Sequence, residues 1–205
     1  MNRIIRKIAA VCAAAAMIFA LTGCNPEKRS GAEHYDKSYY INKYGGDLDS
    51  NLSVFPDEVK PDRVIRFESS FGEGLFDTDG YMILEYTCDE GQIAAEEERL
   101  KEISFTISHY DGQTFTNHIV YDETSYPYPA YITNDGFDST YEYALIDRDG
   151  GRIVYVYGAF VIPDGFPYKD YLKTDLSAYK TDSLKAFTVY NHSFDGGKSW
   201  DEFDD

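Results

Sequence analysis

The chain has 205 residues, with 36 acidic and 19 basic side chains and a formal net charge of −17 at pH 7. This excess of acid argues against nucleic-acid binding, which needs Lys and Arg side chains to replace the counterions of the phosphates. It also argues against a domain that lies flat on an anionic membrane surface, and it favours a soluble exported domain.

The first 26 residues have the layout of a secretory signal peptide. Residues 2–7 include the three basic side chains Arg3, Arg6 and Lys7, and residues 8–26 carry no charged side chain. A charged region, an apolar region and small residues before a cut site are typical of such a leader. Two alternatives remain from this pattern: a transmembrane helix, for which the stretch is long enough but weakly apolar, and a signal peptide that is cut without lipid attachment.

The leader ends in Leu21-Thr22-Gly23-Cys24. These four residues resemble the lipobox of bacterial lipoproteins, in which Leu, a small residue and Gly or Ala precede Cys. The resemblance implies cleavage between Gly23 and Cys24 and a diacylglyceryl group on the sulfur of Cys24, whose amino group can be acylated as well. Cys12 is the weaker candidate because Val11 is too large for the cut site. The implied product is exported, anchored by lipid to the bacterial cell membrane, and faces outward.

Cleavage before Cys24 defines the mature chain. Residues 1–23 hold three basic side chains and no acid, so the formal charge changes from −17 to −20. Besides Cys24 the mature chain holds Cys88 alone, so we expect no internal disulfide, and Cys88 is predicted to be a small buried hydrophobe. Nineteen Tyr and thirteen Phe supply large contact areas for a core.

The mature chain is predicted to divide into a tether and one domain. Residues 24–50 are expected to be the lipidated Cys24 and a flexible tether, because residues 25–49 are polar and lack sustained apolar periodicity. Contact with the domain or with a partner is the alternative for four apolar residues of this tether: Tyr35, Tyr39, Tyr40 and Ile41. Residues 51–205 are expected to form a single domain.

The first part of the domain is predicted to contain short strands and one helix. A turn or strand at residues 52–56, a strand at residues 63–68 and a turn at residues 77–80 precede an aromatic-rich strand at residues 81–88. The helix spans residues 89–101, with Asp89 and Gln92 spaced as a capping box. Its expected buried face holds Ile93, Leu100 and Ile103, and its expected i,i+4 ion pair joins Glu97 to Lys101.

Hairpins are predicted after the helix. Residues 103–108 alternate between apolar and hydroxylic side chains, Asp111-Gly112 favours a tight turn, and residues 115–121 return. A two-residue turn pairs residues whose numbers sum to 223, which would put His118 opposite Phe105 on the apolar face. A second hairpin is expected at residues 140–147 and 152–161, then a short helix within residues 169–179 and a last strand at residues 184–192.

This order predicts an α+β fold in which an antiparallel sheet, built of hairpins, packs against one main helix. The order also resembles uncharacterised bacterial lipoproteins that join the same anchor to a small Tyr-rich domain. Residues 52–56 and 81–100 carry this resemblance. It implies no activity.

Near the end, Ser193, Asp195, Gly197 and Trp200 resemble the Asp box of sialidases and other propellers. In that family the box is a structural turn away from the catalytic pocket. The pattern occurs once here, whereas a propeller has about four or more blades. We therefore expect a stabilised hairpin turn and no sialidase activity.

No catalytic or metal-binding constellation stands out in the sequence. His109 and His118 fall four pairs apart on the predicted ladder, and the Cys and His residues have no zinc spacing, so we expect neither metal nor cofactor. Carboxylates are so abundant that a glycosidase-like pair carries little information. The leading hypothesis is a domain that acts by binding or structural interaction at the cell surface, with an unidentified protein or glycan partner.

The alternative is a hydrolase of cell-surface carbohydrate. A pocket with two carboxylates, one of them desolvated, beside exposed Tyr rings would favour that hydrolase. A surface whose strongly buried acids are all paired would favour the binding function.

Overall fold

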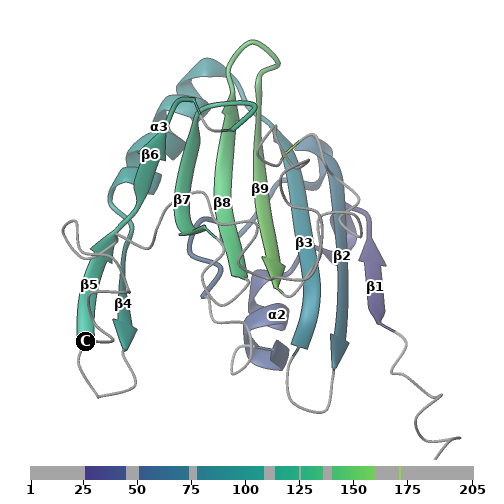
Figure 1. Cartoon of the computed structure of the whole chain (residues 1–205). Helices are drawn as coiled ribbons and strands as arrows, with labels where there is room; N and C mark the ends of the chain where they lie inside the picture. The colour runs from purple at the N-terminus through teal and green to yellow at the C-terminus, as the bar shows by residue number, and fades with distance from the viewer. Residues whose placement is uncertain are drawn as a thin grey trace, which may run out of the picture.

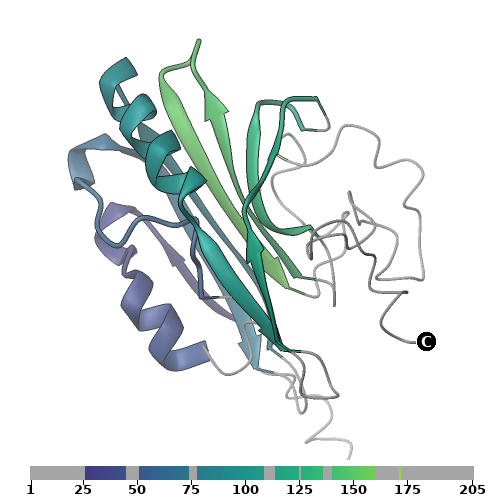
Figure 2. The same ribbon diagram turned by 90° about the vertical axis from the view of Figure 1, so that its left-hand side faces the viewer.

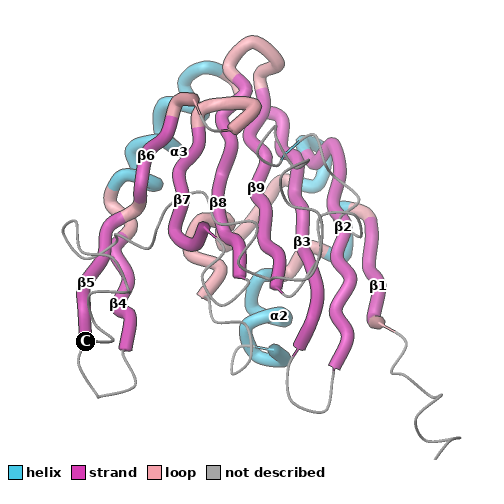
Figure 3. The backbone as a smooth tube through the Cα atoms, in the orientation of Figure 1, coloured by secondary structure: helices cyan, strands magenta, loops and turns pink. Residues whose placement is uncertain are grey.

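The computed structural model describes residues 26–44, 51–73, 78–108, 114–124, 126–135 and 140–159, together with Tyr171. Its largest element is a seven-stranded antiparallel sheet in the order β1-β2-β3-β9-β8-β7-β6 (Figures 1 and 3). The strands are β1 (Glu27–Ser30), β2 (Val64–Glu73), β3 (Thr78–Thr87), β6 (Val120–Asp122), β7 (Ala130–Asp135), β8 (Thr140–Asp147) and β9 (Arg152–Ala159). Strands β4 (Ser104–Ser108) and β5 (Thr114–His118) form a separate ribbon.

Two α-helices cover one face of the large sheet, as Figure 2 shows. They are α2 (Lys37–Tyr44) and α3 (Glu90–Lys101), and two short 3-10 helices, η1 (Ala32–His34) and η2 (Pro61–Arg63), lie in the connections. The α+β class and the antiparallel sheet are therefore confirmed. The sheet carries a second α-helix in addition to the predicted one.

Both faces of the central strands are buried. Every residue of β8 is buried, and so is every residue of β9 except Arg152. On the helix side the core includes Phe67, Leu84, Ile93, Leu100 and Tyr155. On the other side it includes Ile83, Ile132, Tyr143, Val154 and Val156, packed against Tyr126, Tyr128 and Tyr171. Strands buried on both faces need apolar side chains at consecutive positions. Successive residues of β8 and β9 therefore contribute to two cores.

The tether predicted for residues 24–50 is wrong for residues 27–44. Strand β1 pairs with β2, and helix α2 packs on the sheet with Tyr40 and Tyr44 buried. The Tyr40 ring lies 5.5 Å from the Phe71 ring, and the hydroxyl groups of Tyr40 and Ser69 are 2.7 Å apart. The alternative contact of these aromatic residues with the domain is therefore the correct one. A polar strand at a sheet edge and an eight-residue helix need no long apolar pattern.

Helix α3 begins as predicted, with its ion pairs arranged differently. The Asp89 side chain accepts from the Gln92 amide while Gln92 Oε1 accepts from the Asp89 amide, each at 3.0 Å. The capping box is confirmed, and so is the burial of Ile93 and Leu100. The expected Glu97–Lys101 pair is wrong, because Lys101 binds Glu98 and Glu97 instead binds Arg148 from the β8–β9 turn.

The two predicted hairpins have different outcomes. The β8–β9 hairpin is confirmed, with Asp147 paired to Arg152 and Gly151 at a φ of 61° in the turn. In the β4–β5 ribbon, Ser104 pairs with His118, so partner numbers sum to 222. The predicted register is wrong by one residue, which moves a side chain to the opposite face. His118 is exposed.

The turn predicted at residues 77–80 is also displaced. Strand β3 already begins at Thr78, and Gly80 lies inside it, paired with Phe71. A Cβ atom at Gly80 would lie 2.6 Å from Phe71 Cδ1 and closer still to the Ser70 carbonyl oxygen. The glycine therefore permits close approach of two strands and does not mark a turn.

Candidate functional site

The residues singled out from the sequence lie mostly outside the described part of the chain. This holds for Gly23 and Cys24 at the lipobox, and for His109 and His192. It also holds for the Asp-box-like residues Ser193, Asp195, Gly197 and Trp200, for the strand expected at residues 184–192, and for the helix expected within residues 169–179 apart from Tyr171. These predictions remain predictions.

A cluster of buried charged side chains lies where β3 and β8 end and β9 begins. Asp147 pairs with Arg152, and Arg152 pairs with Thr87 on β3. Glu85 lies two residues before Thr87, so its side chain points to the same face. Glu85 is 3% exposed and Asp147 is 6% exposed.

Arg152 joins the two buried carboxylates. Its Nη1 donates to Glu85 Oε2 at 2.9 Å, and its Nε donates to Asp147 Oδ2 at 2.8 Å. The other oxygens also accept: Glu85 Oε1 from the Tyr171 hydroxyl at 2.5 Å, and Asp147 Oδ1 from the Gly150 amide at 2.8 Å. All four carboxylate oxygens therefore have a donor inside the fold.

The protons of this cluster are held firmly. The hydrogen bond with Asp147 raises the pKa of the Arg152 guanidinium, which stays charged. Burial, and then the bond to Glu85, raises the pKa of the Tyr171 hydroxyl above its ordinary value. A tyrosine and an arginine that both keep their protons at neutral pH can orient carboxylates, but they are poor proton carriers.

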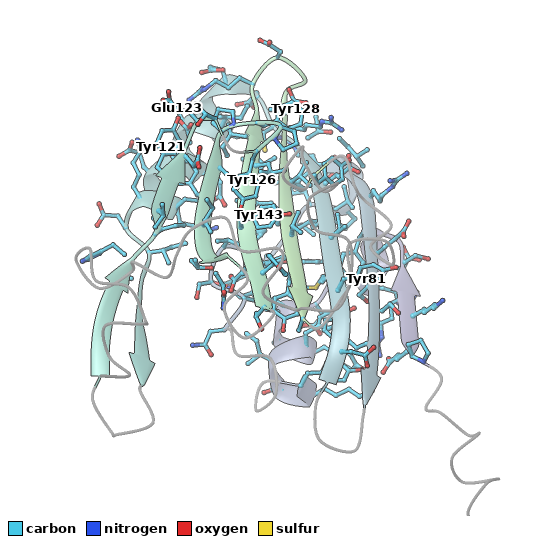
Figure 4. All side chains as sticks on the ribbon, in the orientation of Figure 1. Tyr81, Tyr121, Glu123, Tyr126, Tyr128 and Tyr143 are labelled. Atoms are coloured by element: carbon cyan, nitrogen blue, oxygen red, sulfur yellow. The ribbon has the colours of Figure 1, made fainter. Side chains whose placement is uncertain are left out.

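Tyrosine rings cover the sheet beside this cluster. Tyr126 and Tyr143 have ring centroids 4.8 Å apart, and Figure 4 shows them over the central strands. The Tyr143 hydroxyl donates to the Tyr171 carbonyl at 2.9 Å. Tyr128 accepts from Arg152 Nη2 at 3.2 Å. The rings therefore connect the apolar face of the sheet to the charged cluster.

A third buried carboxylate, Glu142, holds a turn on the opposite face. It accepts from the Val54 amide at 2.8 Å and is 2% exposed. Arg99 donates to the carbonyls of Ser53, at 3.2 Å, and Val54, at 2.5 Å. The next residue back, Leu52, has a φ of 51°, in the left-handed region that costs about 1 kcal/mol or more for a side chain. These contacts therefore stabilise an unfavourable backbone conformation.

Exposed apolar side chains are found at two strands. Ile65 on β2 is 54% exposed and Tyr121 on β6 is 48% exposed. Tyr121 lies 4.9 Å from the Tyr131 ring and donates a hydrogen bond to Glu123 at 3.2 Å (Figure 4). Strand β6 is the last strand in the order of the large sheet.

Sequence reasoning missed the Glu85–Arg152–Asp147 cluster. One signal was present, since Glu85 is an acid inside the apolar run of residues 81–88 and a buried acid needs a partner. The partner is 67 residues away and only strand pairing brings the two together. Spacing along the chain does not reveal such a pair.

Among the described residues, no group of three or more His, Cys, Asp or Glu side chains is arranged to hold a metal ion. The helices in this part of the chain are all too short or too polar to cross a membrane. Comparisons with models of protein families, with curated proteins and with solved structures found no match.

Proposed function

We propose that this chain is an exported lipoprotein, anchored through Cys24, whose folded domain acts by binding or structural interaction at the bacterial cell surface. The anchor is supported by the four lipobox residues and the basic, then apolar, leader before them. The role of the domain is supported by one structural observation above all. Each oxygen of the buried Glu85 and Asp147 carboxylates already accepts a hydrogen bond from Arg152, Tyr171 or Gly150.

The alternative hydrolase needs a different arrangement. A glycosidase uses one carboxylic acid that gives a proton to the leaving group and one carboxylate that faces the sugar or a water. Glu85 and Asp147 are both turned toward one guanidinium, and Glu142 binds a backbone amide. The described acids that are most buried therefore serve the fold.

The anchor is tested by replacing Cys24 with Ala in the full chain, expressed in a bacterium that is fed a labelled fatty acid. We expect the unchanged protein to carry label, to begin at residue 24 by mass spectrometry and to sediment with membranes. The C24A variant should lose all three properties, and the matched variant C12A should keep them. Label on C24A, or an unmodified residue 24 in the parent protein, would contradict the anchor.

The binding function is tested with the same lipidated protein and a set of glycans and peptidoglycan fragments. We expect saturable retention of a partner without chemical change. Turnover that persists through purification and disappears in a Glu85→Gln variant with unchanged thermal stability would replace the binding function by the hydrolase.

A further inference from the structure

The first strand of the large sheet begins only three residues after the proposed anchor. Strand β1 pairs with β2 over four positions, from Glu27 with Phe71 to Ser30 with Glu68. The Gly31 amide extends this pairing with a bond of 3.0 Å to the Phe67 carbonyl. Residues 27–31 are therefore part of the folded body.

The start of this strand is held to helix α2. The Glu27 carboxylate accepts from the Tyr39 hydroxyl at 2.8 Å, from the Tyr44 hydroxyl at 3.0 Å and from Arg29 Nε at 2.7 Å. Lys43 also contacts it. Four donors on two elements fix the point at which the chain enters the domain.

We infer that the domain is held directly at the membrane surface, with the start of β1 and the end of α2 facing the lipid head groups. The inference rests on the proposed lipidation of Cys24. Three residue steps from Cys24 to Glu27 span at most about 10 Å even when the chain is fully extended. A flexible tether of about 24 residues would instead allow a mean separation of roughly 25–30 Å.

The charge of this part of the chain is compatible with that position. Residues 27–44 hold four basic side chains, Lys28, Arg29, Lys37 and Lys43, and three acidic ones, Glu27, Glu33 and Asp36. Their formal charge is thus +1, within a mature chain of −20. Basic side chains near an anionic leaflet are attracted by about 1 kcal/mol each, so this segment escapes the repulsion that the remaining chain experiences.

The same geometry directs the β8–β9 turn away from the membrane. Glu27, Phe71, Gly80 and Ala159 lie in one row across the sheet, and the strand pairing at Thr87 lies seven residues farther along β3. The start of β1 and the end of β8 are thus separated by seven residues along the strand direction and by four strand spacings across the sheet. Together these correspond to a distance of about 30 Å. Figure 1 shows the turn between β8 and β9 at the end of the sheet opposite the start of β1.

The orientation is tested with two single-cysteine labels on the full-length lipidated protein in phospholipid vesicles. Lys28 and Asp149 are both exposed, and each is changed to Cys and labelled with a fluorophore. Cys88 should not react because it is buried and its burial raises the thiol pKa to about 11. We expect nitroxide groups on the lipid head groups to quench the label at position 28 several-fold more strongly than the label at position 149.

A linker variant provides the matched control. Inserting about 20 Gly and Ser residues between Asn25 and Pro26 adds a mean reach of roughly 25 Å, and it should lower the quenching at position 28 to that at position 149. Equal quenching of the two labels without the linker would overturn the orientation while leaving the anchor intact. Failure of the protein to join the vesicles, with an unmodified Cys24, would overturn the anchor and this inference together.

Discussion

Arg152 neutralises two acids that lie more than sixty residues apart in the chain and are both withdrawn from water. Changing Arg152 to Met removes the guanidinium and keeps much of the aliphatic stem. Asp147 would then be buried without a cation, and Glu85 would keep only the half-exposed Arg66 at 3.8 Å. We therefore expect the free energy of unfolding to fall by about 3–5 kcal/mol. Urea denaturation followed by circular dichroism measures this change.

Arg148 is the matched control, four residues before Arg152. It also joins two acids, Glu90 and Glu97, but its own side chain is 44% exposed, while Glu90 is 75% and Glu97 is 12% exposed. Water screens the ion pairs of a half-exposed guanidinium, so Arg148→Met should cost less than Arg152→Met, about 1 kcal/mol. Equal losses for the two variants would show that burial of the Glu85–Arg152–Asp147 cluster has no special energetic weight.

Single residues were predictable where their role depends on local sequence. Asp89 and Gln92 lie three apart and form the capping box, and Cys88 is buried as its apolar neighbours indicate. His118 was misplaced because its face depends on the length of a turn, and one residue more in that turn inverts the strand. The partner of Glu85 was not predictable, because the pairing of β3 with β9 brings Arg152 to it.

At the scale of elements, β1 and α2 are short segments whose sequences do not indicate their secondary structure. Helix α2 has no long apolar stripe, and its burial depends on Tyr40 and Tyr44, four residues apart on one face. Strand β1 has four polar or charged residues because an edge strand needs backbone pairing more than apolar side chains. The boundary predicted at residue 51 therefore falls too late.

The contact between β1 and α2 predicts an acid-sensitive stability. The hydrogen bonds from Lys43, first, and then from Tyr39 lower the pKa of Glu27 to about 2, from an ordinary value of 4.5. A lowered pKa in the folded state adds stability above pH 4.5, and this stability is lost as the pH falls from about 4.5 to 2. Because Glu27 is partly exposed, we expect only about 1 kcal/mol.

Glu27→Gln measures this contribution. The variant should be less stable than the parent protein at pH 7 in urea denaturation, and the difference should vanish near pH 2. Glu33→Gln is the control, since the Glu33 side chain is 73% exposed and its ion pair in the described part of the chain is with the exposed surface residue His34; it should leave the profile unchanged. A difference between parent and E27Q that stays constant from pH 7 to 2 would contradict the assignment.

For the whole molecule, the structure predicts where the domain begins. A chain that starts at Pro26 retains β1 and α2, whereas one that starts at Asn51 loses the covering of Phe67 and Phe71 by Tyr40 and Tyr44. Removing even one such buried aromatic side chain costs about 3–5 kcal/mol. We therefore expect cooperative thermal unfolding for the first chain and none for the second. Equal melting temperatures of the two chains would contradict this boundary and support a tether that extends to residue 50.

The class of the fold was predictable because it follows from local signals, namely hairpin turns and one capped helix. The burial of the second sheet face was not predictable, since antiparallel hairpins are equally compatible with a sheet that has one solvent-exposed face. Tyr126, Tyr128 and Tyr171 cover that face in the described residues. Their positions depend on how distant strands are ordered, which periodicity does not specify.

That strand order makes the large sheet two meanders, β1-β2-β3 and β9-β8-β7-β6, which meet only where β3 pairs with β9. Within each meander the neighbouring strands are close in sequence, apart from β1 and β2. The β3–β9 pairing, by contrast, closes a long loop that includes α3 and the β4–β5 ribbon. Closing a long loop slows folding. Until β9 is in place, β3 presents an open hydrogen-bonding edge that can pair with another chain. A chain that is still being synthesised therefore carries this aggregation risk until β9, the last described strand, has emerged.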